Sequence, residues 1–306
     1  MIFPLLATLA AVPVPQTMTV NADTRLLVIA PHPDDEVLGA GGLIRRVHSA
    51  GGRVRVVYLT DGDGYPEGVR LEEHGKKPTT SDFRDYGRRR EHEAHDALKV
   101  LGLDEHDAMF LRFPDGGLCK LTRSYWSERR AAYRSPYTRR DRPPIANTVV
   151  ADTEYRGEDL TQELARIVGD FGPTVLLVPR KEDQHPDHCA AWYFAADALV
   201  DVARVHPDLK PDLVNYIVHY NDWPFEDEHA SLVPPPGLRG GASGWIRVNL
   251  TREEVRAKRA ALHRYKTQMD AMRDFLETFV RSNEVFSRPA ATRVVLPSRR
   301  NLCCDK

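Results

Sequence analysis

Hydrophobic and polar residues follow two different periods along the chain, and each period predicts one kind of element. Short apolar, β-branched runs predict buried strands at residues 25–30, 53–59, 108–111, 174–178, 213–219 and 245–248. Apolar residues at helical spacing predict helices at residues 37–50, 82–101, 158–171, 186–204, 251–262 and 268–280. Because strands that alternate with helices pair in parallel and are covered on both faces, we predict an α/β fold. The expected architecture is a Rossmann-like three-layer sandwich with a mostly parallel sheet and its active site at the carboxyl ends of the strands.

Two long segments, residues 61–81 and 117–148, are polar and weakly periodic. Loops of this length are usually functional or disordered. The second segment mixes arginine and lysine with tyrosine and tryptophan, which fits a lid that stacks on sugar rings and binds an anionic group, and fits a solvated basic loop equally well. Because the chain has no internal repeat and no clean linker, we expect a single domain over residues 21–306 with a long insert at 117–148.

The beginning of the chain is apolar. Residues 2–14 have the length and small residues of a secretory hydrophobic region, but no basic segment precedes them. We expect residues 1–20 to form a leader or signal segment, which favours an exported protein over a cytoplasmic one. This segment is too short to span a bilayer as a helix and no other segment is suitable, so we expect no stable membrane insertion.

The charge and the cysteine content of the chain exclude several classes of partner and site. The 306 residues carry a formal net charge of −1, so no electrostatic attraction to nucleic acid is expected. The four cysteines form no CxxC pair and predict neither a disulfide framework nor a thiolate metal site. Cys303 and Cys304 have the position of tail residues. No pattern in the sequence indicates an oligomeric state.

Charged residues crowd at the end of the first predicted strand. Its apolar run is followed by His32, Asp34, Asp35 and Glu36. Such charges must be solvated, paired or bound to a metal. Three adjacent acids exceed what helix capping needs, although a helix dipole tolerates them. We therefore predict a metal site at this turn.

A second cluster, His185, Asp187 and His188, follows the predicted strand at 174–178 and opens a helix. Alone, such a pattern is more often polar capping. Two clusters at the same topological place outweigh that interpretation, since neighbouring parallel strands would bring both into one crevice. Two histidines and a carboxylate leave one coordination position open, which is typical of a catalytic zinc site. His185 and His188 are three residues apart and therefore share one helix face.

The sequences HPDDE at 32–36 and HPDH at 185–188, with a Thr-Asp-Gly turn after the second predicted strand, resemble the PIG-L/LmbE-like family of zinc-dependent de-N-acetylases. That family includes N-acetylglucosaminyl-phosphatidylinositol deacetylases, mycothiol and bacillithiol pathway deacetylases, and chitooligosaccharide deacetylases. The similarity is good over residues 25–118 and 174–195, and the insert between them has no recognised counterpart.

The resemblance implies a role for each residue of the two motifs. It makes His32, Asp35 and His188 the metal ligands. Asp34 is then the general base, adjacent to a ligand and able to reach the same water. His185 stabilises the oxyanion or protonates the leaving amine.

Other residues receive roles with less support from the motifs. The resemblance implies substrate binding by Arg90 and a hydrogen bond between Asp115 and sugar hydroxyls. On chemical grounds, Asp187 can orient one of the two imidazoles that flank it in the second cluster. Glu36 has no role beyond that of an acid in the first helical turn. His219 lacks a paired acid at ligand spacing and is not expected in the site.

We expect a metal-dependent hydrolase that removes an acetyl group from an N-acetylated amino sugar, a small-molecule conjugate of the N-acetylglucosamine type. Zn²⁺ is the expected cofactor, and Fe²⁺ or Co²⁺ fits the same ligands. Three alternatives stay open. They are hydrolysis of another amide or acyl conjugate at this site, a non-haem iron oxygenase with the same two-histidine–carboxylate set, and a non-catalytic carbohydrate-binding protein.

Overall fold

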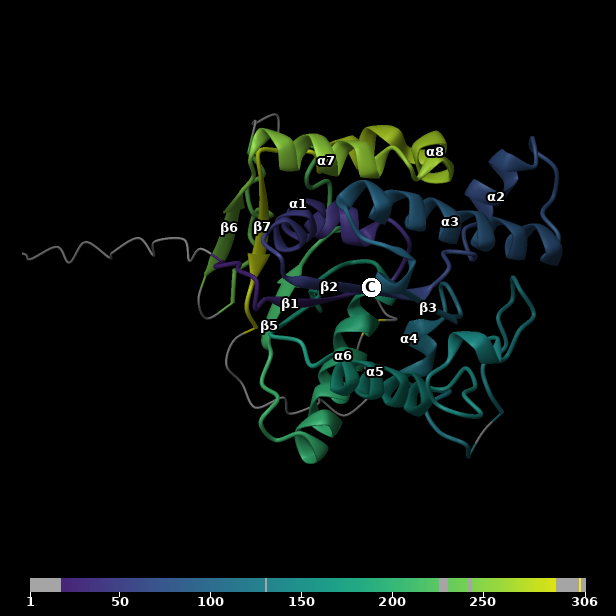
Figure 1. The fold of residues 1–306 in the computed structure, drawn as a ribbon. Helices are drawn as coiled ribbons and strands as arrows, with labels where there is room; N and C mark the ends of the chain where they lie inside the picture. Colours follow the sequence, from purple (N-terminus) through teal and green to yellow (C-terminus); the bar gives the residue numbers. More distant parts are fainter. Residues whose placement is uncertain (1–17, 130, 226–230, 242–243, 290–302, 304–306) are drawn as a thin grey trace, which may run out of the picture.

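The computed structural model describes residues 18–129, 131–225, 231–241, 244–289 and 303. Residues 1–17, which include most of the expected leader, lie outside the described residues. The centre of the fold is a seven-stranded sheet with the strand order β3-β2-β1-β4-β5-β7-β6 (Figure 1). The strands are β1 (Arg25–Ala30), β2 (Arg53–Thr60), β3 (Ala108–Phe113), β4 (Val175–Pro179), β5 (Asp212–Tyr216), β6 (Trp245–Asn249) and β7 (Asn283–Ser287).

Strands β1 to β5 pair in parallel, whereas β7 is antiparallel to both β5 and β6. The predicted mostly parallel sheet is therefore confirmed. Strand β7 was not predicted, because its sequence is half polar. Its Asn283 and Glu284 are nevertheless buried. The Asn283 side chain exchanges hydrogen bonds of 2.7 and 2.9 Å with the backbone of Leu232, which satisfies its amide inside the protein.

Helices cover both faces of the sheet (Figure 1). They are α1 (Asp35–Ser49), α2 (Pro66–Glu72), α3 (Thr80–Leu101), α4 (Leu118–Leu121), α5 (Gly157–Phe171), α6 (Pro186–Val205), α7 (Arg252–Leu262) and α8 (Lys266–Glu277), with short 3₁₀ turns η1 (Glu105–Asp107) and η2 (Ile145–Asn147). One face carries α1, α3, α7 and α8, and the other carries α4, α5 and α6. None of the described helices has both the length and the hydrophobicity that crossing a bilayer requires.

The central strand β1 shows why the sheet is buried between two layers. Leu26 and Val28 belong to the hydrophobic cluster on the α1 side, whereas Leu27 and Ile29 belong to the cluster on the α6 side. This alternation follows the period of two of a strand. Because both sets are apolar, the strand reads as one continuous hydrophobic run, as parallel central strands do.

Helix α1 is kinked at Ala40, which has φ −151° and ψ 17°. The kink leaves backbone groups without partners in the helix, and a buried ion pair supplies them. Glu284 accepts hydrogen bonds from the N–H groups of Gly42 and Leu43 at 2.8 and 2.9 Å. Lys258 donates to Glu284 at 2.8 Å and to a carbonyl of the first half of α1. The pair therefore joins α1, α7 and β7 inside the core.

The two polar segments that showed little periodicity contain short elements. The first carries α2, and the second carries α4 and η2. Within the second segment, the Tyr137 ring lies 5.1 Å from the Phe83 ring of α3. The insert is thus packed against the α3 layer at this point.

The cysteines contradict the expectation from the sequence. Cys189, in the first turn of α6, forms a disulfide with Cys303, with a Cα–Cα distance of 5.7 Å. Cys303 is buried in the hydrophobic cluster on the α6 side, so its expected status as a free tail residue is wrong. The two residues are 114 positions apart, and cysteine spacing carries no signal for a pairing at that distance.

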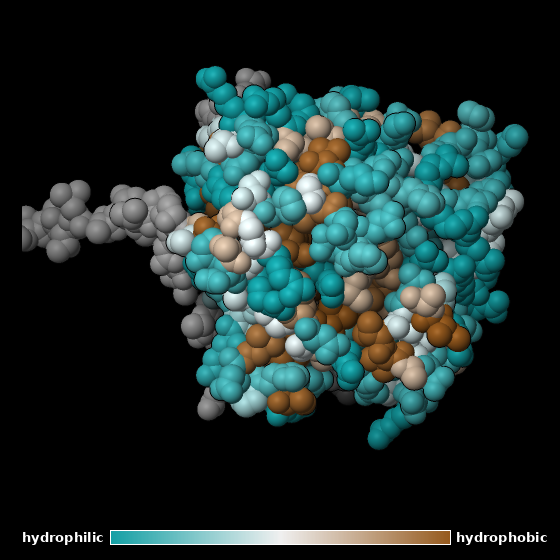
Figure 2. Space-filling model, viewed as in Figure 1, coloured by the Kyte–Doolittle hydropathy of each residue, from teal (hydrophilic) through white to brown (hydrophobic). Residues whose placement is uncertain are grey.

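On the face that Figure 2 shows, hydrophilic side chains cover most of the surface, and hydrophobic residues gather around the centre of that face (Figure 2). The surface on this face is therefore mixed in hydropathy.

Candidate metal centre

Two strand-to-helix turns form the site. Asp34, the N-cap residue of α1, follows β1, and His185, the N-cap residue of α6, follows β4. Strands β1 and β4 are hydrogen-bonded neighbours, with Leu26 opposite Val175. The two turns therefore meet at one edge of the sheet, where the carboxyl ends of the parallel strands lie.

Three side chains from the two turns converge on one point. His32 Nδ1 lies 3.2 Å from Asp35 Oδ2, His188 Nε2 lies 3.1 Å from the same oxygen, and the two nitrogens are 3.3 Å apart. All three residues are buried. Tetrahedral zinc with bonds of about 2.0–2.2 Å places its ligand atoms about 3.3–3.6 Å apart. The donor triangle thus fits a divalent cation and leaves a fourth position for water or substrate.

Carboxylates behind the triangle set the orientation of both imidazoles. His188 Nδ1 lies 3.2 Å from Asp183 Oδ2, which leaves the Nε2 lone pair for a metal. His32 Nε2 lies 3.1 Å from Asp115 Oδ1 and 3.6 Å from Asp187 Oδ2, which favours a proton on Nε2 and a lone pair on Nδ1. Such carboxylate–histidine pairs fix the tautomer of metal ligands.

The electrostatics of the group favour a positive charge at its centre. Burial alone would lower the pKa of His188, but the Asp183 and Asp35 carboxylates raise it to about 10. Burial would raise the pKa of Asp35, but His188 and His32 hold it well below its usual range. The pKa of His32 is likewise raised, because Asp115 outweighs the effect of burial. A cation can take the place of these protons.

Asp34 lies next to the triangle in a conformation that non-glycine residues rarely adopt. Its φ is 123°, and its N–H donates a hydrogen bond of 3.2 Å to Glu36. Glu36 is completely buried and also accepts a hydrogen bond from the Tyr265 hydroxyl. Burial raises the pKa of Asp34 to about 7, although the Arg90 guanidinium opposes this. A carboxylate with such a pKa suits a general base near neutral pH.

Arg90 supports the turn that carries Asp34. Its guanidinium is buried, donates to the carbonyls of Pro33 at 2.6 Å and Gly62 at 3.1 Å, and lies 3.4 Å from Asp34 Oδ2. Gly62 has φ 64°, and a Cβ there would lie 1.9 Å from Arg90 Nη1, so the Thr-Asp-Gly turn requires glycine. These contacts place Arg90 as a support for Asp34, and substrate binding by Arg90 stays a prediction.

Asp115 and Asp187 meet between the two clusters. Asp115 accepts a hydrogen bond of 2.6 Å from Gly64, in addition to its position beside His32. Asp187 accepts from the N–H groups of Gly116 and Leu118 at 2.7 and 3.0 Å. The imidazole beside the Asp187 carboxylate is that of His32, in the first cluster, and not one of the two that flank Asp187 in the sequence. The hydrogen bonds that Asp187 accepts fasten the turn after β3 to α6. Sugar binding by Asp115 stays a prediction.

His185 faces both ligand histidines. Its ring centroid is 4.7 Å from that of His32 and 5.0 Å from that of His188. As the N-cap of α6, its Nδ1 accepts the N–H of Asp187 at 3.3 Å, which places the proton on Nε2. Burial and the nearby imidazoles hold its pKa well below its usual value. A neutral ring with Nε2–H suits hydrogen bonding to an oxyanion, the first of its two predicted roles.

Two residues that sequence reasoning passed over lie in the site. Asp183 is completely buried and accepts hydrogen bonds from the N–H groups of His185, Val218 and His219 at 3.0, 2.9 and 3.1 Å. The His219 ring lies 4.9 Å from that of His188, so its expected exclusion from the site is wrong. The signal that could have found His219 is its position after β5, because β5 is the strand next to β4 in the sheet.

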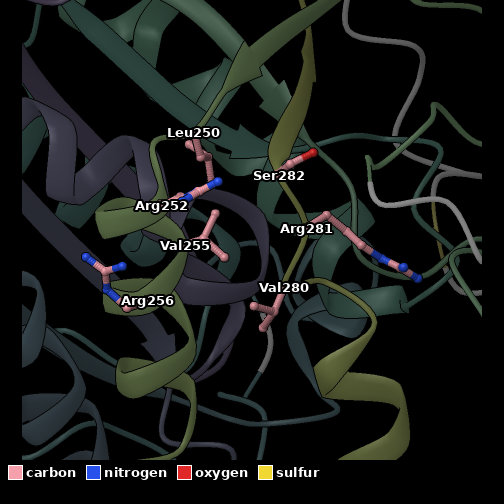
Figure 3. Close-up of a pocket in the computed structure, with 7 residues that line it drawn as sticks. All are labelled: Leu250, Arg252, Val255, Arg256, Val280, Arg281 and Ser282. Atoms are coloured by element: carbon pink, nitrogen blue, oxygen red, sulfur yellow. The ribbon is translucent and has the colours of Figure 1, made fainter.

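A separate pocket of about 430 Å³ lies between the start of α7 and the segment before β7 (Figure 3). Its lining combines apolar and arginine side chains without an acid or imidazole: Leu250, Arg252, Val255, Arg256, Val280, Arg281 and Ser282. None of the candidate ligands contributes to it. We therefore assign the chemistry to the donor triangle.

Fold and site together define a Rossmann-like α/β protein with a His–Asp–His group suited to a catalytic divalent cation. A family model described as GlcNAc-PI de-N-acetylase matches residues 27–199. The chain belongs to this family, PIG-L, and the resemblance seen in the HPDDE and HPDH motifs is confirmed.

Known proteins similar to this chain include a 1D-myo-inositol 2-acetamido-2-deoxy-α-D-glucopyranoside deacetylase from Kribbella flavida, 30% identical over 193 residues. The match covers 62% of this chain and 58% of that protein. Teicoplanin deacetylase, in a zinc-inhibited form, has a similar fold, with a TM-score of 0.54, 20% identity and coverage of 88% of this chain and 100% of that one. The N,N′-diacetylchitobiose deacetylase of Pyrococcus horikoshii also has a similar fold, with a TM-score of 0.51 and 18% identity. That match covers 86% of this chain and 82% of the other.

Proposed function

We propose that the chain is a zinc-dependent hydrolase that removes the acetyl group from an N-acetylated amino sugar in a small conjugate of the N-acetylglucosamine type. The observation that carries this proposal is the donor triangle of His32, Asp35 and His188, 3.1–3.3 Å on each side, with the buried carboxylate of Asp34 next to it. Family membership supports it, as do the acetylated amino sugars in the names of the similar deacetylases.

When bound, zinc lowers the pKa of a water toward about 7 and polarises an amide carbonyl. Asp34 takes a proton from the attacking water as its oxygen bonds to the acetyl carbon. The Nε2–H of His185 donates a hydrogen bond to the developing oxyanion. The C–N bond then breaks, and the leaving nitrogen takes the proton from Asp34, which yields a free amine and acetic acid. The acid releases its proton to solvent near neutral pH and leaves as acetate. Arg90 and Glu36 hold the Asp34 turn in its unusual conformation throughout.

The choice of zinc is part of this proposal. Two imidazoles and one carboxylate suit zinc, and Fe²⁺ or Co²⁺ can occupy the same ligands. An acid next to a ligand has a use in hydrolysis as an acceptor for the proton of water. An oxygenase has no equivalent need for Asp34, so the geometry favours a hydrolase.

We also propose that the protein works outside the cytoplasm. The Cys189–Cys303 disulfide supports this, because disulfides persist mainly in oxidising compartments. The apolar beginning of the sequence agrees with export.

The test is release of acetate from N-acetylglucosamine conjugates by the zinc-loaded protein, with and without a chelator and with and without oxygen. We expect release that stops with the chelator and does not depend on oxygen. Asp34→Asn should lower kcat about 10²- to 10⁴-fold with zinc retained. His32→Ala should lose zinc, as measured by bound-metal analysis. Equal acetate release by Asp34→Asn and wild-type protein would contradict the proposed mechanism.

A further inference from the structure

A row of rings leads from the ligand group toward the protein surface. The His219 ring lies 4.9 Å from that of His188 and 5.3 Å from that of His185. Phe275 of α8 stacks on His219 at 5.6 Å, with the ring planes 13° apart. Phe225 contacts Phe275 in turn at 5.7 Å. We refer to His219, Phe275 and Phe225 as the aromatic strip.

The outer end of the strip is exposed to solvent. Phe225 has 52% of its surface exposed, whereas His219 and Phe275 are partly buried. Singly exposed hydrophobic residues are normal, and the described residues include others, such as Val205 at 73%. Phe225 differs in being an aromatic ring that continuous ring contacts connect to the metal centre. It is therefore the solvent-exposed end of a series of ring contacts that begins at the metal centre.

The strip is held in place from both sides. The loop after His219 is tied to the loop before α6 by two hydrogen bonds of 2.8 Å that Gln184 and Asn221 exchange. On α8, Phe275 packs edge-on against Phe279 at 5.2 Å. Rigid aromatic surfaces lose little conformational entropy when a ligand covers them. The strip is thus preorganised for contact with an apolar group.

The opposite side of the metal centre has different chemistry. There Asp34 and Asp115, from the turns after β1 and β3, lie with Arg90 of α3, and all three are charged and buried. The strip, in contrast, comes from the end of β5, the following loop and α8. A ligand that spans the centre would therefore meet polar groups on one side and aromatic rings on the other.

We propose that the aromatic strip binds an apolar aglycone, an alkyl or aryl group attached to the amino sugar. This inference rests on the proposed function and names the substrate class within it. Covering aromatic surface with methylene groups gains about fourfold in affinity for each group fully removed from water. The strip therefore selects amphipathic glycosides over free or purely polar amino sugars.

The experiment compares methyl, hexyl and phenyl glycosides of N-acetylglucosamine with zinc-loaded protein. We expect wild-type kcat/KM to be at least about tenfold higher for the hexyl than for the methyl glycoside. Phe225→Ser should reduce this ratio to about a third or less, and Phe225→Tyr should restore it. The control is Val205→Ser, since Val205 ends the 20-residue α6 about 30 Å from the centre and should leave the ratio unchanged.

Equal hexyl-to-methyl ratios for wild type and Phe225→Ser overturn the inference. The proposed function is judged separately, by acetate release from the methyl glycoside. If no glycoside releases acetate, titration calorimetry with the same hexyl and methyl glycosides still decides the matter. A hexyl preference in binding that Phe225→Ser reduces supports the strip, and the absence of any preference refutes it. Circular dichroism confirms that each variant is folded.

Discussion

The Asp183 carboxylate lies 3.2 Å from Nδ1 of His188, on the opposite side of the ring from the candidate ligand atom Nε2. Both residues are completely buried. The same carboxylate accepts hydrogen bonds from Val218 and His219 at the end of β5. The orientation of a ligand on α6 thus depends on an acid that also fastens the neighbouring strand.

Replacing this acid should weaken metal binding. Asp183→Asn keeps the shape of the side chain but removes the charge that orients His188 and raises its basicity. Loss of such a partner typically lowers metal affinity about 10- to 100-fold, and we expect a decrease of that size for zinc. Competition with a chromophoric chelator measures it. Asp170→Asn, at an exposed ion pair on α5, is the matched control and should bind zinc as wild type does. Unchanged zinc affinity in folded Asp183→Asn would rule out the orienting role.

The fold could be predicted from the sequence because its signals are local. β1 is an uninterrupted apolar run, and its two faces are buried in different layers. The turn after it carries His32, Asp34, Asp35 and Glu36 in one motif, which predicted a metal site, and the resemblance to the PIG-L family then selected His32 and Asp35 as the ligands. Their meeting with His188 followed from one topological assumption, that β1 and β4 are neighbours.

What escaped prediction depends on contacts between distant segments. Asp183 and His219 gain their positions from the pairing of β4 with β5, which no short motif encodes. Glu36 was expected to be a helix-turn acid, but Tyr265 reaches it from a segment more than two hundred residues away in sequence. The Cys189–Cys303 pairing has the same origin. Single-sequence patterns describe neighbours along the chain, and these residues are neighbours only in space.

The buried pair of Lys258 and Glu284 should contribute strongly to stability. Both side chains are 1% exposed, and they satisfy the backbone at the kink of α1. Lys258→Met leaves the Glu284 charge buried without its partner, so we expect unfolding to become easier by about 3–5 kcal/mol. Chemical denaturation measures this change.

The exposed pair of Arg166 and Asp170 on α5 provides the comparison, with both side chains more than 60% exposed. Arg166→Met should cost no more than about 1 kcal/mol, since solvent screens exposed pairs. Similar losses for Lys258→Met and Arg166→Met would show that burial does not strengthen the Lys258–Glu284 interaction.

The disulfide should stabilise both the fold and the metal centre. Cys189 directly follows His188, and Cys303 is buried in the cluster that packs under α6. The double variant Cys189→Ala/Cys303→Ala should lose about 2–5 kcal/mol, a fall in Tm of roughly 5–15 °C. We also expect weaker zinc binding, because the first turn of α6 loses its tether next to a ligand. A thermal melt and zinc titration that match the wild type would contradict both expectations.

Glu36 should support catalysis through its hydrogen bonds and not through its charge. It accepts the N–H of Asp34, whose φ of 123° needs external support, and the hydroxyl of Tyr265. Burial raises the pKa of Glu36 to about 8, so a neutral replacement loses little charge near neutral pH. Glu36→Gln can accept from Asp34 and donate to Tyr265, and it should keep most of the wild-type kcat. Glu36→Leu leaves the Asp34 N–H buried without a partner and should lower kcat about tenfold or more with zinc retained. If the glutamine and leucine variants lose activity equally, the carboxylate charge, and not support of the Asp34 backbone, is what the site requires.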